Sequence, residues 1–323
     1  MLRFSSPSKV FLCGEYNVLF GGKALAFNLA PRFYLDLNIE SQQISGSNPF
    51  PDGSPAGIYW QQNQNDFAGL QWRFHDPHIG RGGLGASSAQ FLLLKMAHEY
   101  LQALKLDQEW MNEPLLAWKR WEDYKAIGSQ GSGADVLSQS LGGLVEIDPA
   151  LKTAQAFAWP FKDLGLLIYR TGMKVTTHSH LDEFRQSLDA VRDRSQELTE
   201  ASNRVFKALR QSDTNHFLAA NRDYSLLLKE LGLLHPVVKA QIEFFKSEEG
   251  VFARGCGALG ADVVAVLYRK PLWTETSVNQ LIAPLRWEFL GSEHSISEGA
   301  RLEEVQRFRH SENKQLLPGG INV

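Results

Sequence analysis

A glycine-rich segment that runs directly into an apolar helix constrains this chain most. Residues 80–94, GRGGLGASSAQFLLL, place four glycines and two serines in their first nine positions and then turn apolar. Glycine lets the backbone approach a ligand closely or adopt positive φ, and a small hydroxyl residue can cap a helix. The pattern predicts a nest of backbone N–H groups at a helix N-terminus, which can hold an anion. A flexible loop with an ordinary cap is the alternative interpretation.

Two more glycine-rich segments occur far along the chain, at 128–134 and 255–261. None of the three fits the pattern G-x-x-x-x-G-K-[ST], and none fits G-x-G-x-x-G followed by an acidic residue about 20 positions later. We therefore expect any phosphate binding here to follow a different pattern from these two.

Composition narrows the classes of function. The chain has 323 residues, 43% apolar and 21% charged, with a net charge of −3, which allows two domains or one two-lobed unit. A chain with this charge lacks the excess of positive charge that is typical of nucleic-acid binding, and the apolar runs are too short to span a membrane. The first residues, MLRFSSPSKV, lack a secretory apolar region, and two cysteines cannot build a disulfide framework. We expect a cytoplasmic monomer or homodimer that binds a small molecule, with Mg²⁺ as the metal if there is one.

Hydrophobic periodicity predicts an α+β plan with a lobe boundary between 150 and 180. Strands are expected at 8–16, 32–40, 142–148, 164–172 and 262–269. Helices are expected from the first glycine segment to about Leu104, at 109–126, just after 135, and at 180–211, 214–231 and 235–247. Residues 41–66, rich in Ser, Gly, Pro, Asn and Gln, are expected to form a long loop.

Three charged residues lie where they could take part in chemistry. Lys9 is either an edge lysine of an apolar strand or a lysine with a buried stem that presents its ammonium to an anion. Glu15 is either a ligand for a hard metal or a turn residue. Asp135 is either an acidic residue favoured at a helix N-terminus or a general base for an acceptor hydroxyl.

Several serine, threonine and histidine residues can likewise be interpreted as structural or as functional. Ser87 and Ser88 either cap a helix or supply an oxygen to Mg²⁺. Thr176 can be a turn residue. The close histidine pairs, His75/His78 and His178/His180, lack a third ligand at helical spacing and are interpreted as structural or surface residues.

The ordered motifs resemble those of the GHMP kinase superfamily along nearly the whole chain. PSKVFLCGEYNVLFGGKALAF (7–27) resembles its opening motif, and GGLGASSAQF (82–91) its central phosphate loop, with Ala86 in place of the usual first serine. GSGADV followed by LGGLVEI resembles the catalytic-aspartate segment of the mevalonate kinase and phosphomevalonate kinase branch. TGMKVTT (171–177) and GCGALGADVVAVL (255–267) resemble two later motifs.

The resemblance implies an α+β fold of two lobes separated by a deep cleft, with an ATP-binding N-terminal lobe at 1–165 and a C-terminal lobe at 166–323. It implies Asp135 as the catalytic aspartate, assisted by Lys9, and ATP and Mg²⁺ as cofactors. Ser87 is implied as a metal ligand, with Ser88 as the alternative, and Asp123 as a second ligand. The implied phosphate-binding residues are Gly82, Gly83, Leu84, Gly85, Ala86, Ser87 and Ser88.

For the acceptor, the resemblance points to mevalonate or 5-phosphomevalonate, with the latter slightly favoured by GEY and by the Asn-Arg pair at 221–222. Glu15, Tyr16, Thr176 and Gly257 fall in the motifs expected to bind substrate. A phosphorylated acceptor needs cationic partners, for which Arg170, Lys174 and Arg222 are the candidates. A kinase for a sugar or homoserine, and an inactive GHMP-like nucleotide-binding protein, are the alternatives.

Overall fold

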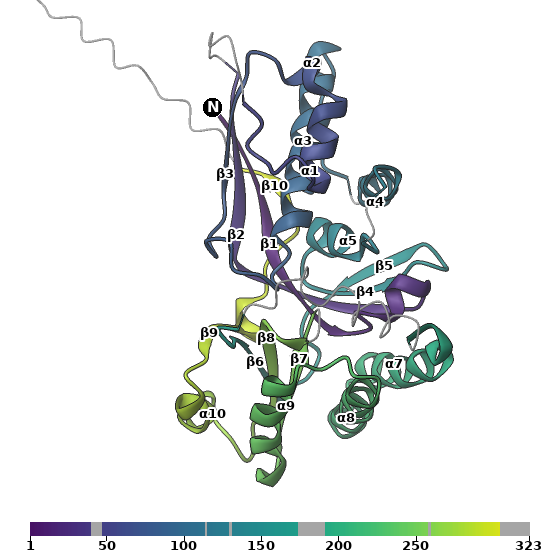
Figure 1. The fold of residues 1–323 in the computed structure, drawn as a ribbon, viewed down its shortest axis with the longest axis vertical. Coiled ribbons are helices and arrows are strands. Elements are labelled where there is room, and N and C mark those ends of the chain that lie inside the picture. Colours follow the sequence, from purple (N-terminus) through teal and green to yellow (C-terminus); the bar gives the residue numbers. More distant parts are fainter. Residues whose placement is uncertain (40–46, 114, 129–130, 174–190, 258–259, 304–323) are drawn as a thin grey trace, which may run out of the picture.

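The computed structural model describes residues 1–39, 47–113, 115–128, 131–173, 191–257 and 260–303. Runs of helices and runs of strands follow one another through them in an α+β arrangement (Figure 1). The strands form two sheets, one of six strands and one of four. The expected α+β class is therefore confirmed.

A long antiparallel hairpin organises the first sheet. It pairs β1 (Leu2–Cys13) with β2 (Ala24–Asn38), and a 3-10 turn, η1 (Asn17–Phe20), lies in the connection. Alternation in β2 buries Phe33, Leu35 and Leu37, as its sequence predicted. The order is β10-β1-β2-β4-β5, with β3 also paired to β2. The other strands are β3 (Gln71–His75), β4 (Leu144–Asp148), β5 (Thr153–Phe157) and β10 (Arg301–Leu302).

Helices from the first half of the chain pack against this sheet. They are α1 (Pro55–Gln62), α2 (Gln64–Phe67), α3 (Ala86–Lys105), α4 (Leu116–Ala126) and α5 (Ala134–Leu141). The expectation of one long loop at 41–66 was wrong, because α1 lies within it and α2 begins within it. Ser54 caps α1 by accepting from the N–H of Gly57, and Tyr59 and Trp60 are buried in the same core as Phe91. The helix expected at 109–126 begins only at Leu116.

The second sheet is antiparallel, in the order β7-β8-β6-β9. Its strands are β6 (Leu164–Arg170), β7 (Val251–Cys256), β8 (Val263–Arg269) and β9 (Glu288–Ser292). Helices α7 (Ser195–Arg210), α8 (Thr214–Glu230), α9 (Pro236–Glu243) and α10 (Glu275–Ile282) accompany it, with short 3-10 turns η2 (Phe244–Ser247), η4 (Ala283–Leu285) and η5 (Glu293–Ser295).

One apolar core spans both sheets. It joins Val10 and Phe27 of the first sheet to Leu166 and Val263 of the second, and it includes residues of α7 and α8. Strand β10 pairs with β1, so a late segment of the chain is part of the first sheet. The expected division at 165–166 falls within β6, and the two lobes and the deep cleft between them stay predictions.

A buried polar chain also crosses between the sheets, centred on His78. Its Nε2 lies 2.7 Å from Oγ of Ser8 in β1, and its Nδ1 lies 2.9 Å from the guanidinium of Arg170 in β6. Arg170 in turn donates to Glu288 of β9 at 2.8 Å. Burial, followed by the nearby charge of Arg170, lowers the pKa of His78 from 6.5 to about 4. His78 is therefore a neutral structural residue, as its lack of metal-ligand spacing predicted.

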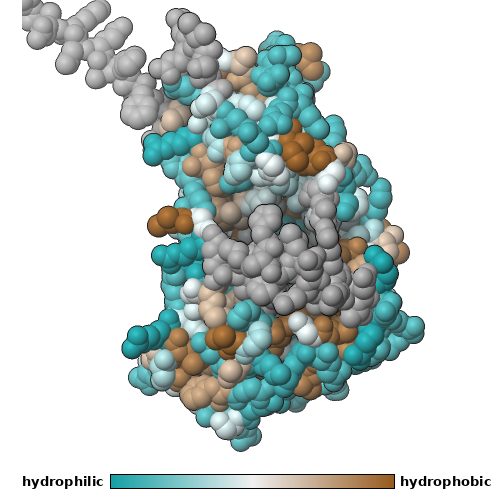
Figure 2. All heavy atoms as spheres, in the orientation of Figure 1, coloured by the Kyte–Doolittle hydropathy of each residue, from teal (hydrophilic) through white to brown (hydrophobic). Residues whose placement is uncertain are grey.

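The molecular surface mixes polar and apolar residues. On the face shown in Figure 2, apolar patches appear among polar residues toward the end where Figure 1 places α9 and α10. Within the described ranges, no helix combines the length and the apolarity that crossing a membrane requires.

Candidate active site

Lys9 and Asp135 form an ion pair at the centre of the candidate site. Nζ of Lys9 lies 2.8 Å from Oδ1 of Asp135, and the two side chains are 7% and 33% exposed. The ammonium also lies 4.1 Å from the ring centroid of Phe11. Of the two interpretations of Lys9, the buried stem with a paired ammonium is the one that this geometry fits. Because one oxygen of Asp135 is paired and its side chain is partly exposed, the carboxylate can contact a ligand while Lys9 holds it.

Asp135 is positioned by the second glycine segment. Gly133 precedes α5 with φ +75°, so Asp135 occupies the second position of the helix. A Cβ on Gly133 would come within 2.6 Å of the ring of Trp121. Only glycine satisfies both this backbone angle and this close packing without displacement. Acidic side chains are favoured in the first turn of a helix, because the helix dipole is positive there.

The first glycine segment packs directly onto Lys9. The N–H of Lys9 donates to the carbonyl of Leu84 at 3.1 Å. Gly85 has φ +82°, and a Cβ there would lie 3.0 Å from Cγ of Lys9 and 3.0 Å from Nε2 of Gln139. The positive φ that the sequence predicted is therefore present, and the missing side chain at 85 gives room to Lys9. The glycine loop and Asp135 thus meet at the same lysine.

Helix α3 begins at this loop and leaves its first N–H groups available. Gly85 is its N-cap residue and no side chain caps it, so the alternative in which a serine caps this helix does not hold. Ser88 is buried, and its hydroxyl donates to the carbonyl of Gly85 at 2.9 Å, whereas Ser87 is exposed. The first N–H groups of an α-helix have no partner within the helix, and with the helix dipole they favour an anion.

Asp262, the residue that follows the third glycine segment, lies beside the first segment. A Cβ on Gly82 would come within 2.7 Å of Oδ2 of Asp262, and one on Gly83 within 2.8 Å of its Cβ. Gly82 and Gly83 therefore allow the loop to pack against the start of β8. Gly257, which follows β7 with φ +77°, has no described atom within 4 Å of the place of a Cβ, so its backbone is open to a ligand.

Gln139 is a site residue that the sequence reasoning missed. Its side chain is fully buried, and its Nε2 donates to the carbonyls of Pro7 at 2.8 Å and Gly85 at 3.1 Å. It lies four residues after Asp135 on α5, and this i, i+4 spacing, which puts both on one face of the helix, was the available signal. Gln139 therefore links α5 to the glycine loop and to β1.

The predicted metal ligands differ in their surroundings. Oδ2 of Asp123 lies 2.8 Å from Nζ of Lys95 on α3, and the aspartate side chain is 33% exposed. Ser87 has an exposed hydroxyl near the start of the same helix. No group of three or more His, Cys, Asp or Glu side chains suited to a metal occurs among the described residues. A Mg²⁺ bound mainly through phosphates would need only one or two protein oxygens, and the metal roles of Ser87 and Asp123 stay predictions.

Two of the four predicted substrate residues, Glu15 and Tyr16, are buried. Glu15 pairs with Arg254, and the hydroxyl of Tyr224 donates to its other oxygen at 3.4 Å. Burial raises the pKa of Glu15 although the charge of Arg254 opposes this. Tyr16 is buried in the core beside it. Thr176 lies outside the described residues, and the substrate roles of Glu15, Tyr16, Thr176 and Gly257 stay predictions.

The cations expected to hold a phosphorylated acceptor are engaged elsewhere or not described. Arg170 is 5% exposed and pairs with Glu288. Arg222 lies with its guanidinium carbon 5.8 Å from the ring centroid of Phe252. Lys174 lies outside the described residues.

Comparison with known proteins finds similar structures but no similar sequences. No family model and no curated protein sequence matches this chain significantly. Solved structures do match, among them phosphomevalonate kinase of Streptococcus pneumoniae in complex with phosphomevalonate and AMPPNP, at TM-score 0.72 and 16% identity, over 90% of this chain and 99% of that one. Mevalonate kinase of Methanococcus jannaschii matches at TM-score 0.64 and 17% identity, over 90% and 97%.

Galactokinase of Lactococcus lactis, complexed with galactose, matches at TM-score 0.70 and 13% identity, over 93% of this chain and 94% of that one. All three matches cover nearly the whole of both chains, so the likeness extends to the complete arrangement of sheets and helices. This chain therefore has the fold of the GHMP kinases, as its motifs predicted.

Proposed function

We propose that this protein is an ATP-dependent kinase that transfers the γ-phosphate to mevalonate or 5-phosphomevalonate, with 5-phosphomevalonate slightly favoured. The observation that carries the proposal is the ion pair between Lys9 and Asp135, 2.8 Å apart, directly against Gly85 of the glycine loop. Phosphoryl transfer needs positioning and neutralisation of charge more than covalent help from the protein. A helix N-terminus, an ammonium and a carboxylate at one point meet that need.

In this proposal the glycine loop and the first turn of α3 hold the phosphates of ATP. The residues concerned are Gly82, Gly83, Leu84, Gly85, Ala86, Ser87 and Ser88. Their N–H groups would bind phosphate oxygens, and the dipole of the 20-residue helix would favour the negative charge. The complex of the S. pneumoniae enzyme with AMPPNP supports a nucleotide as the ligand of this fold.

Asp135 then acts on the acceptor. The attacking group is the hydroxyl of mevalonate or the monoprotonated phosphate of 5-phosphomevalonate. Its oxygen attacks the γ-phosphorus, the bond from that phosphorus to the bridging oxygen of ADP breaks, and the proton of the attacking group passes to the carboxylate of Asp135. Lys9 keeps that carboxylate in place and stabilises negative charge on the attacking oxygen. Gln139 holds the loop and α5 at a fixed spacing while this occurs.

Magnesium is part of the proposal. Ser87 and Asp123 would supply its protein oxygens, and Mg²⁺ would neutralise charge on the phosphates. Lys95 now pairs with Asp123, so this carboxylate would exchange part of a lysine contact for a metal contact. Before a metal binds, the ion pair with Lys95 would hold Asp123 beside α3.

The choice of acceptor rests on the sequence motifs and on the structural likeness to enzymes of both kinds. A kinase for galactose or homoserine is the second candidate, because galactokinase has the same fold at a comparable TM-score. An inactive nucleotide-binding protein is the third candidate, and the presence of Lys9 beside Asp135 argues against it.

Release of ADP from MgATP tests these candidates when it is measured with mevalonate, 5-phosphomevalonate, homoserine and galactose in parallel. We expect kcat/KM for mevalonate or 5-phosphomevalonate to exceed the values for the other two by at least about 100-fold, since hydrogen-bonding sites discriminate strongly between polar substrates. A preference for homoserine or galactose would assign the second candidate. Binding of ATP without turnover of any acceptor would assign the third.

A further inference from the structure

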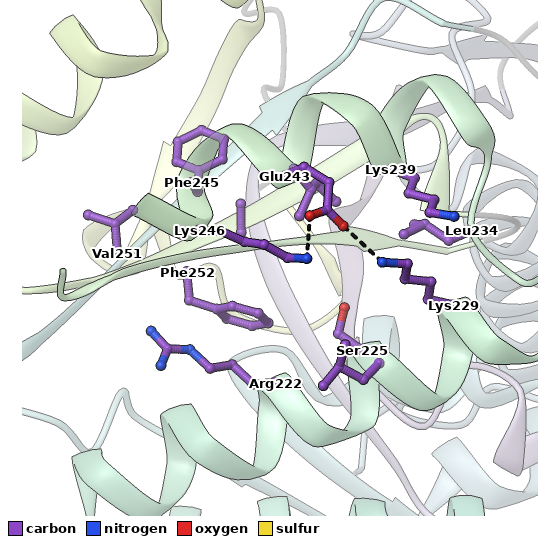
Figure 3. Close-up of a pocket in the computed structure, with 13 residues that line it drawn as sticks. Arg222, Ser225, Lys229, Leu234, Lys239, Glu243, Phe245, Lys246, Val251 and Phe252 are labelled. Carbon is purple, nitrogen blue, oxygen red and sulfur yellow. Dashed lines mark hydrogen bonds and ion pairs between the residues drawn. The ribbon is translucent and has the colours of Figure 1, made fainter. Parts of the chain in front are cut away.

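A pocket that the proposed reaction does not use lies between α8, α9 and β7. It has a volume of about 330 Å³ and is drawn in Figure 3. None of its lining residues belongs to the glycine loop or to the Lys9–Asp135 pair. The volume is at the lower end of the range of about 300–1,000 Å³ that small-molecule sites occupy.

Its interior is apolar. Phe245 and Val251 are buried, and Leu234, Ile242 and Phe252 are partly buried around them. Figure 3 shows the ring of Phe252 between α8 on one side and the turn that follows α9 on the other. An apolar chain placed against these side chains would be removed from water, which favours binding in proportion to the area covered.

Its rim carries four cationic side chains and one carboxylate, namely Arg222, Lys229, Lys239, Lys246 and Glu243. Glu243 accepts from Nζ of Lys229 at 2.9 Å and also pairs with Lys246 (Figure 3). That single carboxylate is therefore shared by two lysines. Within the described part of the chain, Arg222 and Lys239 form no ion pair with a carboxylate, so positive charge is in excess around the apolar interior.

We propose that this pocket binds an amphipathic anion, a small molecule with an apolar chain and a carboxylate or phosphate head. The apolar interior would take the chain and the lysines of the rim would take the head. A neutral apolar molecule would leave the cations without partners, and inorganic phosphate would leave the apolar interior open. The two kinds of surface together select a ligand that has both features.

Calorimetric titration with decyl phosphate and decanoate, each below the concentration at which it self-associates, tests the proposal on the full chain. Decanol and decyltrimethylammonium are the neutral and cationic controls. We expect saturable binding of one molecule of at least one anion, weaker at high salt, and at least about tenfold weaker binding of both controls. A preference between the two anions identifies the head group.

Two variants locate the binding. Lys239→Glu should weaken binding of the anion by at least about fivefold, whereas Lys207→Glu, the same change on the exposed face of α7, should not. Ser225→Phe, which places a ring in the pocket from α8, should abolish binding. Thermal melts of both pocket variants establish that they are folded, and the Ser225 variant keeps the test valid if Lys239→Glu unfolds.

Three results would overturn the proposal. The first is the absence of saturable binding of either anion to the wild-type chain. The second is equal binding to the Lys239→Glu and Lys207→Glu variants, or equal binding of the cationic control. The third is a dimer in sedimentation that Ser225→Phe breaks and that decyl phosphate does not affect, which would assign the pocket to a second copy of the chain.

Discussion

Nζ of Lys9 lies 2.8 Å from Oδ1 of Asp135, while the carbon stem of the same lysine fills the space that a side chain at Gly85 would need. One residue of β1 therefore fixes the distance between the glycine loop and the first turn of α5. The same contact explains why the loop must have glycine at position 85. In the proposed reaction, the phosphate-binding loop and the catalytic carboxylate cannot move apart without displacing Lys9.

Gly85→Ala should lower ATP affinity strongly. The new Cβ would lie 3.0 Å from Cγ of Lys9 and 3.0 Å from Nε2 of Gln139, so the start of α3 must shift. Gly21→Ala is the matched control, because Gly21 has the same φ of +82° and no atom within 4 Å of the place of a Cβ. Both variants should lose about 1–3 kcal/mol of unfolding free energy through backbone strain. Only Gly85→Ala should lower the affinity for ATP measured by calorimetry. Equal ATP affinities of the two variants would show that the glycine loop is not part of the nucleotide site.

Gln139→Leu should lower kcat while ATP affinity changes less. The substitution removes the donor to Pro7 and Gly85 and leaves the buried carbonyl of Pro7 with the long 3.4 Å contact from the Ser6 hydroxyl, which costs about 1–3 kcal/mol of unfolding free energy. Asn28→Leu is the control, because Asn28 is also buried and donates to Ser138 on α5 and to Gly143 without contact to the loop. Equal losses of kcat in the two variants would mean that Gln139 acts only through stability.

The free energy of unfolding should depend on pH through His78. The pKa of His78 is about 4 in the folded protein and near 6.5 in an unfolded chain, so the unfolded state binds more protons between these values. This contribution is therefore complete above pH 6.5 and is lost as the pH falls toward 4. His78→Gln keeps a donor and an acceptor but does not titrate.

The wild-type advantage over His78→Gln in unfolding free energy should shrink by about 3 kcal/mol between pH 7 and pH 4, because one pKa unit corresponds to about 1.36 kcal/mol. Denaturant titrations of both proteins across this range provide the measurement. A difference that stays constant with pH would show that His78 titrates normally in the folded state.

The fold was predictable where local periodicity and burial agree. The apolar run at 164–172 predicted β6 closely, whereas the alternation at 32–40 predicted only the second half of β2, which already begins at Ala24. The helices within 55–67 were not predicted, because the polar composition of this segment is typical of a loop. Ser54 and Pro55, which are typical of a helix start, were the signal for α1. The burial of Tyr59 and Trp60 against distant aromatic residues stabilises these helices, and a single sequence does not show such contacts. The pairing of β10 with β1 is long-range for the same reason.

The candidate site was predictable in part. The glycine segments and Asp135 were visible as motifs, because backbone angles and helix starts require particular residue types at fixed spacing. The ion pair of Lys9 with Asp135 joins segments far apart in sequence, and only the resemblance suggested it. Gln139 was missed because its partners are backbone carbonyls. Its i, i+4 spacing from Asp135 indicates a shared helix face but not those partners.

The turnover of Asp135→Asn on the best acceptor, compared with that of the wild-type chain, tests whether Asp135 takes part in phosphoryl transfer. The amide keeps the shape of the side chain but cannot accept the proton, so we expect kcat to fall by about 10²–10⁴-fold with little change in ATP affinity. Asp107→Asn, an exposed aspartate with φ +52°, controls for the chemical change. A kcat within about twofold of wild type for Asp135→Asn would contradict the assignment of Asp135 to the reaction.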